Sequence, residues 1–426
     1  MTVWLVNPYG PLPSEAWRTY CFPLIAEALV EAGHEVIWWT SNFAHHFKKF
    51  RSDGWRDVKV SDRFTIRLVP TPGYRRNIGL GRVLRDIVFA YRCYKRGRAE
   101  PRPDLVIYAE SPLTFGFAGQ RLADYHRCAS IYHQMDLWPE LIVRRAPRMF
   151  QSLVDLAFEP VYAIRRKTYS RLSAATALAS PYLEAVIKDA PCLADRPQAV
   201  IYNGIDVHDF RAKMRASTQW PPGFPEKCEG DIWAIFAGSL GPSYDIGTMC
   251  TAAEILAAED SNIRILIAGD GPERARVEAA ARGVSARKNL FYLGQLSPSE
   301  LAAVYSRCDI GLCAYSSSSN VEMPDKIYDY TAAQLPVLVS LTGEVSRMVA
   351  THGAGLPYRA GSAEDLCAQM GALASDSLVL AEMARASGAL GLEFDKKKQY
   401  SKFVQIVQSV TGSPRAMGLT RHDSAS

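Results

Sequence analysis

The sequence predicts a two-domain α/β protein in which each domain contains a Rossmann-like, mainly parallel sheet. Its 426 residues are enough for two domains of ordinary size. The chain opens with a buried strand at Val3–Asn7, a helix from about Trp17 to Gly33, and a second strand, G-H-E-V-I-W-W-T, which is the order of a βαβ unit. The second half opens in the same way, because W-A-I-F-A-G-S-L-G runs from a buried strand into a glycine-rich turn and a helix near Ile246.

Composition limits the class of protein. Hydrophobic residues make up 48% of the chain and charged residues 22%, values typical of a soluble globular protein. No apolar run approaches the ~20 residues of a transmembrane helix, and the N-terminus reads as a strand rather than a signal peptide. The nine cysteines form no C-x-x-C pair, which argues against a cysteine-based zinc site. We therefore expect a cytoplasmic protein.

Positive charge is concentrated in the first half. Residues 1–205 contain 28 Lys and Arg against 19 Asp and Glu, whereas residues 206–426 contain 21 and 25. The segments Arg75–Arg98 and Arg144–Arg171 combine clustered arginines with apolar residues at helical spacing. Such helices can lie on an anionic membrane surface, into which residues such as Phe89 or Phe150 would insert. The alternative is two ordinary helices with a buried stripe and a solvated basic face. No nucleic-acid-binding motif is present, so we expect no nucleic-acid partner.

Further strands are expected in the first domain at Thr65–Pro70, Pro103–Ala109, Ala129–Gln134 and Ala174–Ser180, with a long helical stretch at Phe150–Leu172. The third strand runs into H-Q-M-D-L-W-P-E, which places His133 and Asp136 at its carboxyl end, where ligands of open α/β sheets bind. These two side chains could orient a ligand there or hold one of its hydroxyls. The alternative is that Asp136 caps the following helix. Asn203-Gly204 is a turn signal, and we place the domain boundary there.

The second domain is organised around the stretch Glu322–Val345. Pro324 suits the first turn of a helix, which is predicted to span Asp325–Gln334, and a buried strand follows at Val337–Ser340. A helix N-terminus attracts phosphate, and Lys326 lies in that first turn, where a cation is unfavourable unless an anion is near. Asp329, one turn further, could accept ribose hydroxyls. An ordinary amphipathic helix with a solvated lysine is the alternative.

At this point the chain resembles a known family. P-D-K-I-Y-D-Y-T-A-A-Q-L-P-V-L is similar to the P-x-K-x-x-E-Y-x-A-A-G-x-P-V signature of the retaining GT-B glycosyltransferases of family four. D-L-W-P-E resembles the subset that builds bacterial surface polysaccharides on lipid carriers, and V-I-Y-N-G-I-D-V-H-D-F resembles the family's interdomain linker. The resemblance extends over nearly the whole chain and implies the GT-B fold, in which two Rossmann-like domains face each other across a cleft.

The resemblance also implies roles for individual residues. The donor-binding residues would be Gly238, Ser239, Gly269, Gly294, Leu296, Glu322, Pro324, Lys326 and Asp329. The acceptor-binding residues would be Tyr9, Gly10 and Arg18, and the catalytic ones His133, Asp136 and Lys326. Glu322 lies seven residues before Asp329, whereas the family spacing between its two glutamates is eight. The glycine-rich loop after Ala237 lacks the family's Arg or Lys, so Lys326 carries more of the diphosphate binding.

The implied activity is retaining glycosyl transfer from a nucleotide sugar, with UDP expected rather than GDP, to a lipid-linked or oligosaccharide acceptor. Neither a cofactor nor a metal is expected. The domains would be residues 1–205, with a C-terminal helix at about 396–411 packing back on them, and residues 206–395; the tail 412–426 is expected to be disordered. The protein could lie peripherally on the inner face of the cell membrane. A GT-B transferase for a soluble acceptor, a sugar-nucleotide epimerase and a non-catalytic nucleotide-sugar-binding protein remain open.

Overall fold

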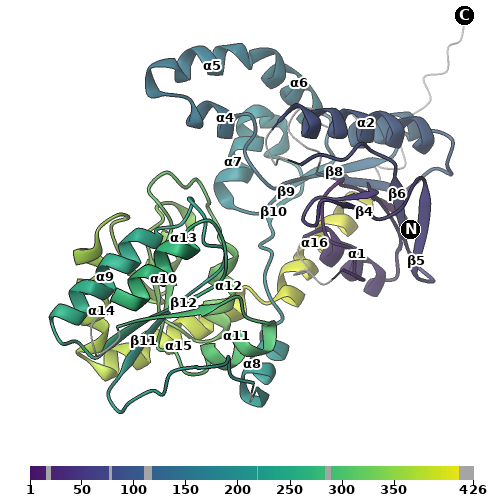
Figure 1. Ribbon diagram of the computed structural model, residues 1–426. Helices are drawn as coiled ribbons and strands as arrows, with labels where there is room; N and C mark the ends of the chain where they lie inside the picture. The colour runs from purple at the N-terminus through teal and green to yellow at the C-terminus, as the bar shows by residue number, and fades with distance from the viewer. Residues whose placement is uncertain (16–20, 76–78, 110–117, 218, 284–288, 412–426) are drawn as a thin grey trace, which may run out of the picture. The chain divides into compact units, whose positions relative to one another are not determined.

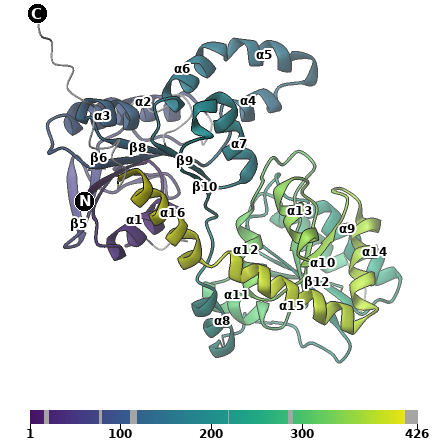
Figure 2. The ribbon, with the colours of Figure 1, turned by 180° about the vertical axis from the view of Figure 1, so that it is seen from behind.

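The structure, a computed structural model, describes residues 1–15, 21–75, 79–109, 118–217, 219–283 and 289–411. The chain divides into two compact units, one formed by residues 1–203 with the segment from Gln399 onward, the other by Gly204–Lys398 (Figure 1). Each unit has a mainly parallel sheet with helices on both faces (Figure 2). This confirms the predicted α/β class with two Rossmann-like sheets.

The sheet of the first unit has eight strands in the order β10-β9-β8-β7-β1-β2-β6-β5. All neighbours are parallel except the edge pair β5 and β6. The strands are β1 (Thr2–Val6), β2 (Glu35–Ser41), β5 (Arg56–Ser61), β6 (Phe64–Val69), β7 (Leu105–Tyr108), β8 (Ala129–Gln134), β9 (Ala174–Ala177) and β10 (Gln198–Val200). A separate two-stranded ribbon joins β3 (Phe43–Ala44) to β4 (Lys49–Phe50). The chain order reverses at β1, between β7 and β2, and ligands of open α/β sheets bind at the carboxyl edge beside such a switch point.

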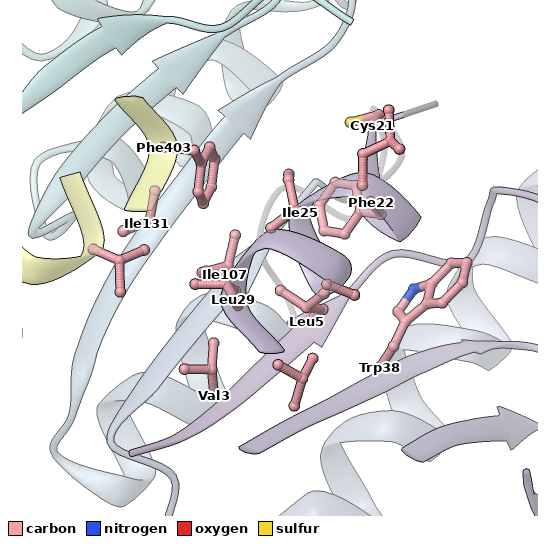
Figure 3. Close-up of a cluster of buried hydrophobic side chains, with 14 of the residues drawn as sticks. Val3, Leu5, Cys21, Phe22, Ile25, Leu29, Trp38, Ile107, Ile131 and Phe403 are labelled. Atoms are coloured by element: carbon pink, nitrogen blue, oxygen red, sulfur yellow. The ribbon is translucent and has the colours of Figure 1, made fainter. Parts of the chain in front are cut away.

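Successive side chains of each strand point to opposite faces of the sheet, so the first unit has two hydrophobic cores, one on each face. Val3 and Leu5 of β1 face α1 (Phe22–Glu31) and α16 (Lys396–Thr411), whose Phe403 lies in the same cluster (Figure 3). Trp4 and Val6 face the opposite side, because successive side chains of a strand point to opposite faces. That side is covered by α2 (Leu80–Gly97), α3 (Gly119–His126), α6 (Glu159–Tyr169) and α7 (Ser180–Asp189).

The sheet of the second unit has six parallel strands in the order β13-β12-β11-β14-β15-β16. They are β11 (Ile232–Ala237), β12 (Ile263–Ala268), β13 (Leu290–Gly294), β14 (Ile310–Cys313), β15 (Val337–Val339) and β16 (Gly355–Pro357). Counted within the unit this is the order 3-2-1-4-5-6 of dinucleotide-binding folds, with the switch point between β11 and β14. One face is covered by α9 (Ile246–Ala258), α10 (Arg274–Gly283) and α14 (Ala363–Ala374).

The remaining helices complete the two units. In the second unit, α12 (Asp325–Ala332) packs against α15 (Ser377–Glu393) and α8 (Val207–Ala216), and α8 also contacts α11 (Pro298–Tyr305). Helix α13 (Glu344–Thr351) follows β15. In the first unit, α4 (Glu140–Arg145), the 3₁₀ turn Arg148–Phe150, α5 (Gln151–Ala157) and α6 form an excursion between β8 and β9, and a second 3₁₀ turn, Pro191–Leu193, follows α7.

Several predicted elements have different bounds in the structure. The long helical stretch expected at Phe150–Leu172 is helical but consists of two helices, α5 and α6, because Pro160 lacks an N–H and fits only the first turn of a new helix. The helix expected up to Gln334 stops at Ala332, since Gln334 adopts a left-handed φ of 60°. Strand β9 ends at Ala177, and Ser180 already begins α7. Phe89, suggested for membrane insertion, is 1% exposed and belongs to the core.

Candidate functional site

Three glycine-containing loops lie side by side at the carboxyl edge of the second sheet. Gly238 follows β11, Gly269 follows β12, and Gly294 ends β13. The N–H of Gly269 donates to the carbonyl oxygen of Gly294 at 2.7 Å. A Cβ on Gly269 would lie 1.8 Å from the carbonyl oxygen of Gly238, and the φ of Gly269 is +140°. Only glycine allows these backbones to approach so closely, which leaves peptide groups rather than side chains at the switch point.

Lys326 reaches this loop edge from α12. Its ammonium lies 4.6 Å from the ring centroid of Phe236 and 4.4 Å from that of Tyr244. A Cβ on Gly238 would fall 1.9 Å from Nζ, so the missing side chain of Gly238 provides the space for the ammonium. Lys326 is 8% exposed. The prediction of a solvated lysine is therefore wrong, and the cation is buried beside the glycine loop.

The position of Lys326 depends on how α12 is anchored. Tyr330, one turn after Lys326, accepts a hydrogen bond from the N–H of Ala237 at 3.1 Å and donates to the carbonyl oxygen of Leu312 at 3.3 Å. A Cβ on Gly311 would lie 2.5 Å from the Tyr330 ring, so the tyrosine packs directly on β14. Pro324 is the N-cap of α12, one position before the first turn predicted for it. The helix is thereby fixed to the end of β11.

Other predicted donor residues lie around the same edge. Asp329 is half-buried on α12, three residues after Lys326, and Ser239 is exposed directly after Gly238. Leu296 is half-buried after β13, and the hydroxyl of Tyr292 in that strand donates to the carbonyl oxygen of Gly269 at 2.9 Å. The structure thus brings the glycines, Lys326 and the end of β13 together at one edge of the sheet.

Glu322 has a structural contact of its own. Its Oε2 accepts a hydrogen bond at 3.1 Å from the N–H of Glu344, the first residue of α13. Gly343 lies against the same carboxylate, since a Cβ there would meet Oε2 at 2.5 Å. A carboxylate at a helix N-terminus is favoured by the helix dipole. Glu322 therefore caps α13, and its expected contact with the donor stays a prediction.

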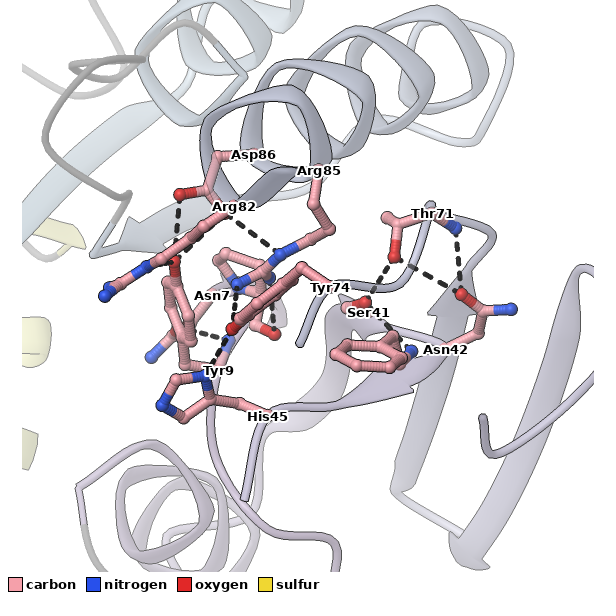
Figure 4. A network of polar contacts seen from close by, with 12 residues as sticks. Asn7, Tyr9, Ser41, Asn42, His45, Thr71, Tyr74, Arg82, Arg85 and Asp86 are labelled. Atoms are coloured by element: carbon pink, nitrogen blue, oxygen red, sulfur yellow. Dashed lines mark hydrogen bonds and ion pairs between the residues drawn. The ribbon is translucent and has the colours of Figure 1, made fainter. Parts of the chain in front are cut away.

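In the first unit, the loop after β1 brings Tyr9 into a polar cluster with α2 (Figure 4). The Tyr9 hydroxyl donates to Asp86 at 2.9 Å and accepts from Nε of Arg82 at 2.9 Å. The guanidinium of Arg85 lies 4.2 Å from the Tyr9 ring centroid. Burial and the surrounding cations lower the pKa of His45, which lies edge-on to Tyr9, to about 3. None of these partners of Tyr9 was identified from the sequence. Arg82, Arg85 and Asp86 belong to the basic stretch Arg75–Arg98, and His45 lies in no recognised motif.

Gly10 is fixed by hydrogen bonding to Arg51 and by packing. Nη2 of Arg51 donates to the Gly10 carbonyl oxygen at 2.8 Å and also to Glu15 at 2.8 Å. The φ of Gly10 is +108°, and a Cβ would approach the Trp38 ring to 3.2 Å. Gly10 thus fixes the course of the loop that presents Tyr9. Arg18, the third predicted acceptor residue, lies outside the described residues.

His133 is an internal residue of β8. It is 1% exposed, and its ring lies between Phe22 and Phe403 at centroid distances of 6.2 and 5.9 Å. Nδ1 shares a hydrogen bond of 2.9 Å with the Thr176 hydroxyl. Burial lowers the pKa of His133 to about 3 because a charged ring would lose its hydration. A neutral His133 supports the core behind Asp136, and its predicted catalytic role stays untested.

Asp136 follows β8 at the carboxyl edge of the first sheet. Its side chain is exposed, yet crowding by protein atoms raises its pKa to about 6, while Arg82 acts in the opposite direction. Water screens part of this effect at an exposed carboxyl. Asp136 and Arg82 are thus close enough for their charges to interact. This brings Asp136 and Tyr9 to the same rim, as their positions after β8 and β1 predict.

Two family models match the chain. The model described as "Glycosyltransferase Family 4" covers residues 24–209, and the one described as "Glycosyl transferases group 1" covers residues 223–388. A curated relative, UDP-glycosyltransferase TURAN of Arabidopsis thaliana, is 29% identical over 76 residues, 18% of this chain and 16% of the relative. The chain therefore matches about a sixth of the length of this curated relative.

Solved structures match over almost the whole chain. HepE of Anabaena in complex with UDP has 13% identity and a TM-score of 0.66, covering 96% of this chain and 100% of its own. A UDP-forming trehalose-phosphate synthase from Burkholderia xenovorans has 11% identity and a TM-score of 0.67, covering 97% and 99%. WaaG, a glycosyltransferase involved in lipopolysaccharide biosynthesis, has 15% identity and a TM-score of 0.59, covering 97% and 100%. At these identities the similarity shows the fold, which is GT-B.

The described part of the chain contains neither a membrane-spanning helix nor a metal-binding cluster. None of the helices in that part of the chain is both long and apolar enough to cross a bilayer. Nor do three or more His, Cys, Asp or Glu side chains gather there in a way that could hold a metal ion.

Proposed function

We propose that this chain, a GT-B glycosyltransferase of the family-four type, transfers a sugar from a UDP-sugar to an acceptor linked to polyprenyl diphosphate, with retention at the anomeric carbon. One observation carries the donor half of the proposal. A buried ammonium, that of Lys326, lies beside the Gly238 loop at the switch point of a sheet with the dinucleotide-binding strand order. A buried cation beside closely packed glycine backbone suits a diphosphate.

The chemistry follows from charge. When the bond between the sugar and the nucleotide breaks, negative charge grows on the departing diphosphate. A cation already held in place stabilises that charge without reorganising. In this proposal, Lys326 and the Gly238 and Gly269 loops bind the diphosphate, and Asp329 accepts the ribose hydroxyls. The choice of UDP is supported by the structures of HepE with UDP and with UDP-glucose.

Asp136 is proposed to act on the acceptor side. It lies at the carboxyl edge of the first sheet, next to the rim formed by Tyr9 and Arg82. A carboxylate there can accept a hydrogen bond from the acceptor hydroxyl and orient it for attack. His133 would contribute through packing beneath that edge, as its burial suggests.

The test begins with nucleotides and ends with transfer. UDP, GDP and a panel of their sugars are screened by thermal shift, because a ligand that binds the folded state raises the unfolding midpoint. The stabilising sugar is then offered with short-chain polyprenyl-diphosphate saccharides and with free oligosaccharides. Transfer to the diphosphate acceptors, with an α-linked product from an α-linked donor, supports the proposal. Transfer only to free oligosaccharides indicates a soluble acceptor, conversion of the sugar nucleotide indicates an epimerase, and binding without turnover indicates a non-catalytic protein.

A lipid-linked acceptor requires the protein to reach a membrane, and the first unit has a surface suited to that. Helix α2 exposes Leu80, Leu84, Ile87 and Tyr91, which follow one helical stripe and are 51–87% exposed. The α4–α6 excursion adds a second group of exposed apolar side chains, Met149, Phe150, Leu153, Leu156 and Ile164. Helices α2 and α6 pack on the same face of the sheet, and exposed arginines such as Arg148 and Arg166 accompany the apolar residues.

We propose that this surface, α2 with the α4–α6 excursion, binds the inner face of an anionic membrane. Apolar side chains would enter the headgroup boundary, and each nearby Lys or Arg would add about 1 kcal/mol, screened by salt. Co-sedimentation with neutral and anionic vesicles over a salt series tests this. Leu153→Asp with Leu156→Asp should reduce pelleting, whereas Leu378→Asp, an equally exposed leucine of the second unit, should not. Equal pelleting of all variants, or of both vesicle types, would overturn the membrane surface.

A further inference from the structure

The polar cluster around Tyr9 joins side chains from segments that are far apart in the sequence. We define the Tyr9 cluster by residues from four segments, the loop after β1, the β3–β4 turn, the loop after β6 and the first half of α2. Its members are Tyr9, His45, Lys48, Tyr74, Arg82, Arg85 and Asp86. They lie at the carboxyl edge of the first sheet, because β1, β2 and β6 all end there. This is the edge at which open α/β sheets bind ligands.

Positive charge dominates the described members of this cluster. Lys48, Arg82 and Arg85 are cations, whereas Asp86 is the single carboxylate among them. Asp86 forms an ion pair with Arg85 at 3.1 Å and accepts the Tyr9 hydroxyl. The effect of the excess is visible at Lys48, whose pKa is lowered by burial and by Arg82 and Arg85. Asp136 also interacts with Arg82, and the three cations still outnumber these two carboxylates, so the field at the cluster favours an anion.

His45 and Tyr74 arrange the cations without adding charge. The pKa of His45 is about 3, so its ring is neutral and Nδ1 can accept hydrogen bonds. Nδ1 is contacted by the Tyr74 hydroxyl and, at 3.5 Å, by Nζ of Lys48. Arg85 in turn donates to the Tyr74 hydroxyl at 3.4 Å, and the Lys48 ammonium lies 4.4 Å above the Tyr74 ring. Figure 4 shows Tyr74 placed between Arg85 and His45.

Two members adopt positions that work against stability. Lys48 has a left-handed φ of 53°, a conformation that side-chain-bearing residues rarely adopt. Arg82 lies in the first turn of α2, whose N-cap Gly79 provides no side-chain cap, and the helix dipole disfavours a cation there. Strained or electrostatically unfavourable positions tend to persist at sites that bind something. Both costs would be offset by a bound anion.

We infer that the Tyr9 cluster binds the diphosphate of the acceptor, with Arg82 and Lys48 as its main contacts. The inference rests on the proposed function, since it assigns the phosphate of the second substrate. The donor diphosphate belongs to the Lys326 site of the other unit, so an anion at the Tyr9 cluster comes from another molecule. A planar guanidinium matches phosphate oxygens in two-point geometry, and an ammonium adds a point charge. Tyr9 would position Arg82 through the hydrogen bond at Nε.

The experiment measures pyrophosphate binding directly and needs no turnover. The full-length protein, with its donor site saturated by UDP, is titrated with inorganic pyrophosphate in a calorimeter. Wild-type protein should show one saturable site, and Arg82→Gln should weaken it about tenfold or more. Lys95→Gln, the same loss of charge on the exposed side of α2, should change the affinity less than twofold.

Lys48→Gly is a variant whose loss of pyrophosphate binding could not be explained by misfolding. Glycine adopts the left-handed φ without cost, so its unfolding midpoint should equal or exceed that of the wild type. Its affinity for pyrophosphate should nevertheless fall by about tenfold. Absence of saturable pyrophosphate binding in the folded wild type, or equal affinity in Arg82→Gln, would overturn the inference.

Two further measurements distinguish acceptor diphosphate from phospholipid headgroups as the ligand of the Tyr9 cluster, and distinguish a failure of this inference from a failure of the proposed donor site. If the cluster instead binds phospholipid headgroups, Arg82→Gln will lose binding to anionic vesicles while pyrophosphate shows no saturable site, and the inference falls. UDP binding is recorded for every variant in the same experiments. A failure of pyrophosphate binding with normal UDP binding rejects the Tyr9 cluster alone, whereas a failure of UDP binding in the wild type rejects the proposed donor site.

Discussion

Replacing Lys326 with methionine tests the donor site most directly. The change removes the ammonium but keeps a side chain of similar length between Phe236 and Tyr244. Because the ammonium occupies the space left by Gly238, a nucleotide diphosphate at this loop would contact it at close range. Lys326→Met should therefore weaken UDP binding while the unit remains folded.

The expected magnitude follows from burial. Lys326 is 8% exposed, so water screens its charge only weakly. A hydrogen bond to a charged group contributes about 1.5–3 kcal/mol, which corresponds to a roughly 10- to 150-fold loss of UDP affinity. Stability should change by less than about 1 kcal/mol, since the lost cation–π contacts are offset by removing the cost of a buried charge.

The assay is calorimetric titration with UDP at fixed salt, with thermal unfolding of the nucleotide-free protein recorded alongside. Lys397→Met, the same substitution at an exposed lysine of α16, should leave UDP affinity unchanged. If Lys326→Met binds UDP within twofold of the wild type while its unfolding midpoint is normal, the diphosphate does not lie at this ammonium and the reasoning is refuted.

Four further predictions concern single residues. Asp329→Asn should weaken UDP binding by about 1 kcal/mol, whereas Asp329→Glu should retain most of it, as calorimetry would show. Gly269→Ala should destabilise the protein by at least ~2 kcal/mol in denaturant unfolding, because its Cβ would strike a carbonyl oxygen at 1.8 Å and φ is +140°. Gln334→Gly should stabilise by about 0.5–1 kcal/mol, because the exposed Gln334 has φ 60° and glycine removes that strain. His133→Gln should flatten the loss of stability in acid. The folded-state pKa of about 3 lies below the ordinary 6.5, so the unfolded chain binds the proton first and stability falls with pH from about 6.5 downward, by up to about 1.4 kcal/mol per unit.

Matched controls sharpen two of these predictions. Gly371→Ala places a Cβ in open space within α14 and should stabilise by about 0.5–1 kcal/mol, the opposite sign to Gly269→Ala. His352→Gln alters an exposed histidine and should keep the acid dependence of the wild type. The His133 prediction is contradicted if wild type and His133→Gln lose stability with acid at the same slope, and the Gly269 prediction if Gly269→Ala is as stable as the wild type. A Gln334→Gly variant less stable than the wild type contradicts the Gln334 prediction, and normal UDP affinity in Asp329→Asn contradicts the Asp329 prediction.

The sequence by itself determined the class of fold and the local elements that surround the proposed donor site. Short apolar runs bounded by turn residues, such as Trp233–Ala237, indicate buried strands, and glycines directly after them indicate loops where backbone approaches a ligand. Pro324 and the residues after it indicated a helix N-terminus with Lys326 in its first turn. These signals are local, since they depend on neighbours within a few residues, and the structure agrees with them to within a residue or two.

Only the tertiary structure decided which side chains share a site and which are buried. Lys326 and Gly238 are far apart in the sequence, and nothing local shows that one occupies the space left by the other. His133 lies in β8 and Asp136 lies just after that strand, yet packing against Phe22 and Phe403 makes His133 internal while Asp136 reaches solvent. The other members of the Tyr9 cluster likewise come from three other segments. Burial and charge neighbourhood arise from contacts between distant segments, and a hydrophobic or basic pattern cannot specify which segments meet.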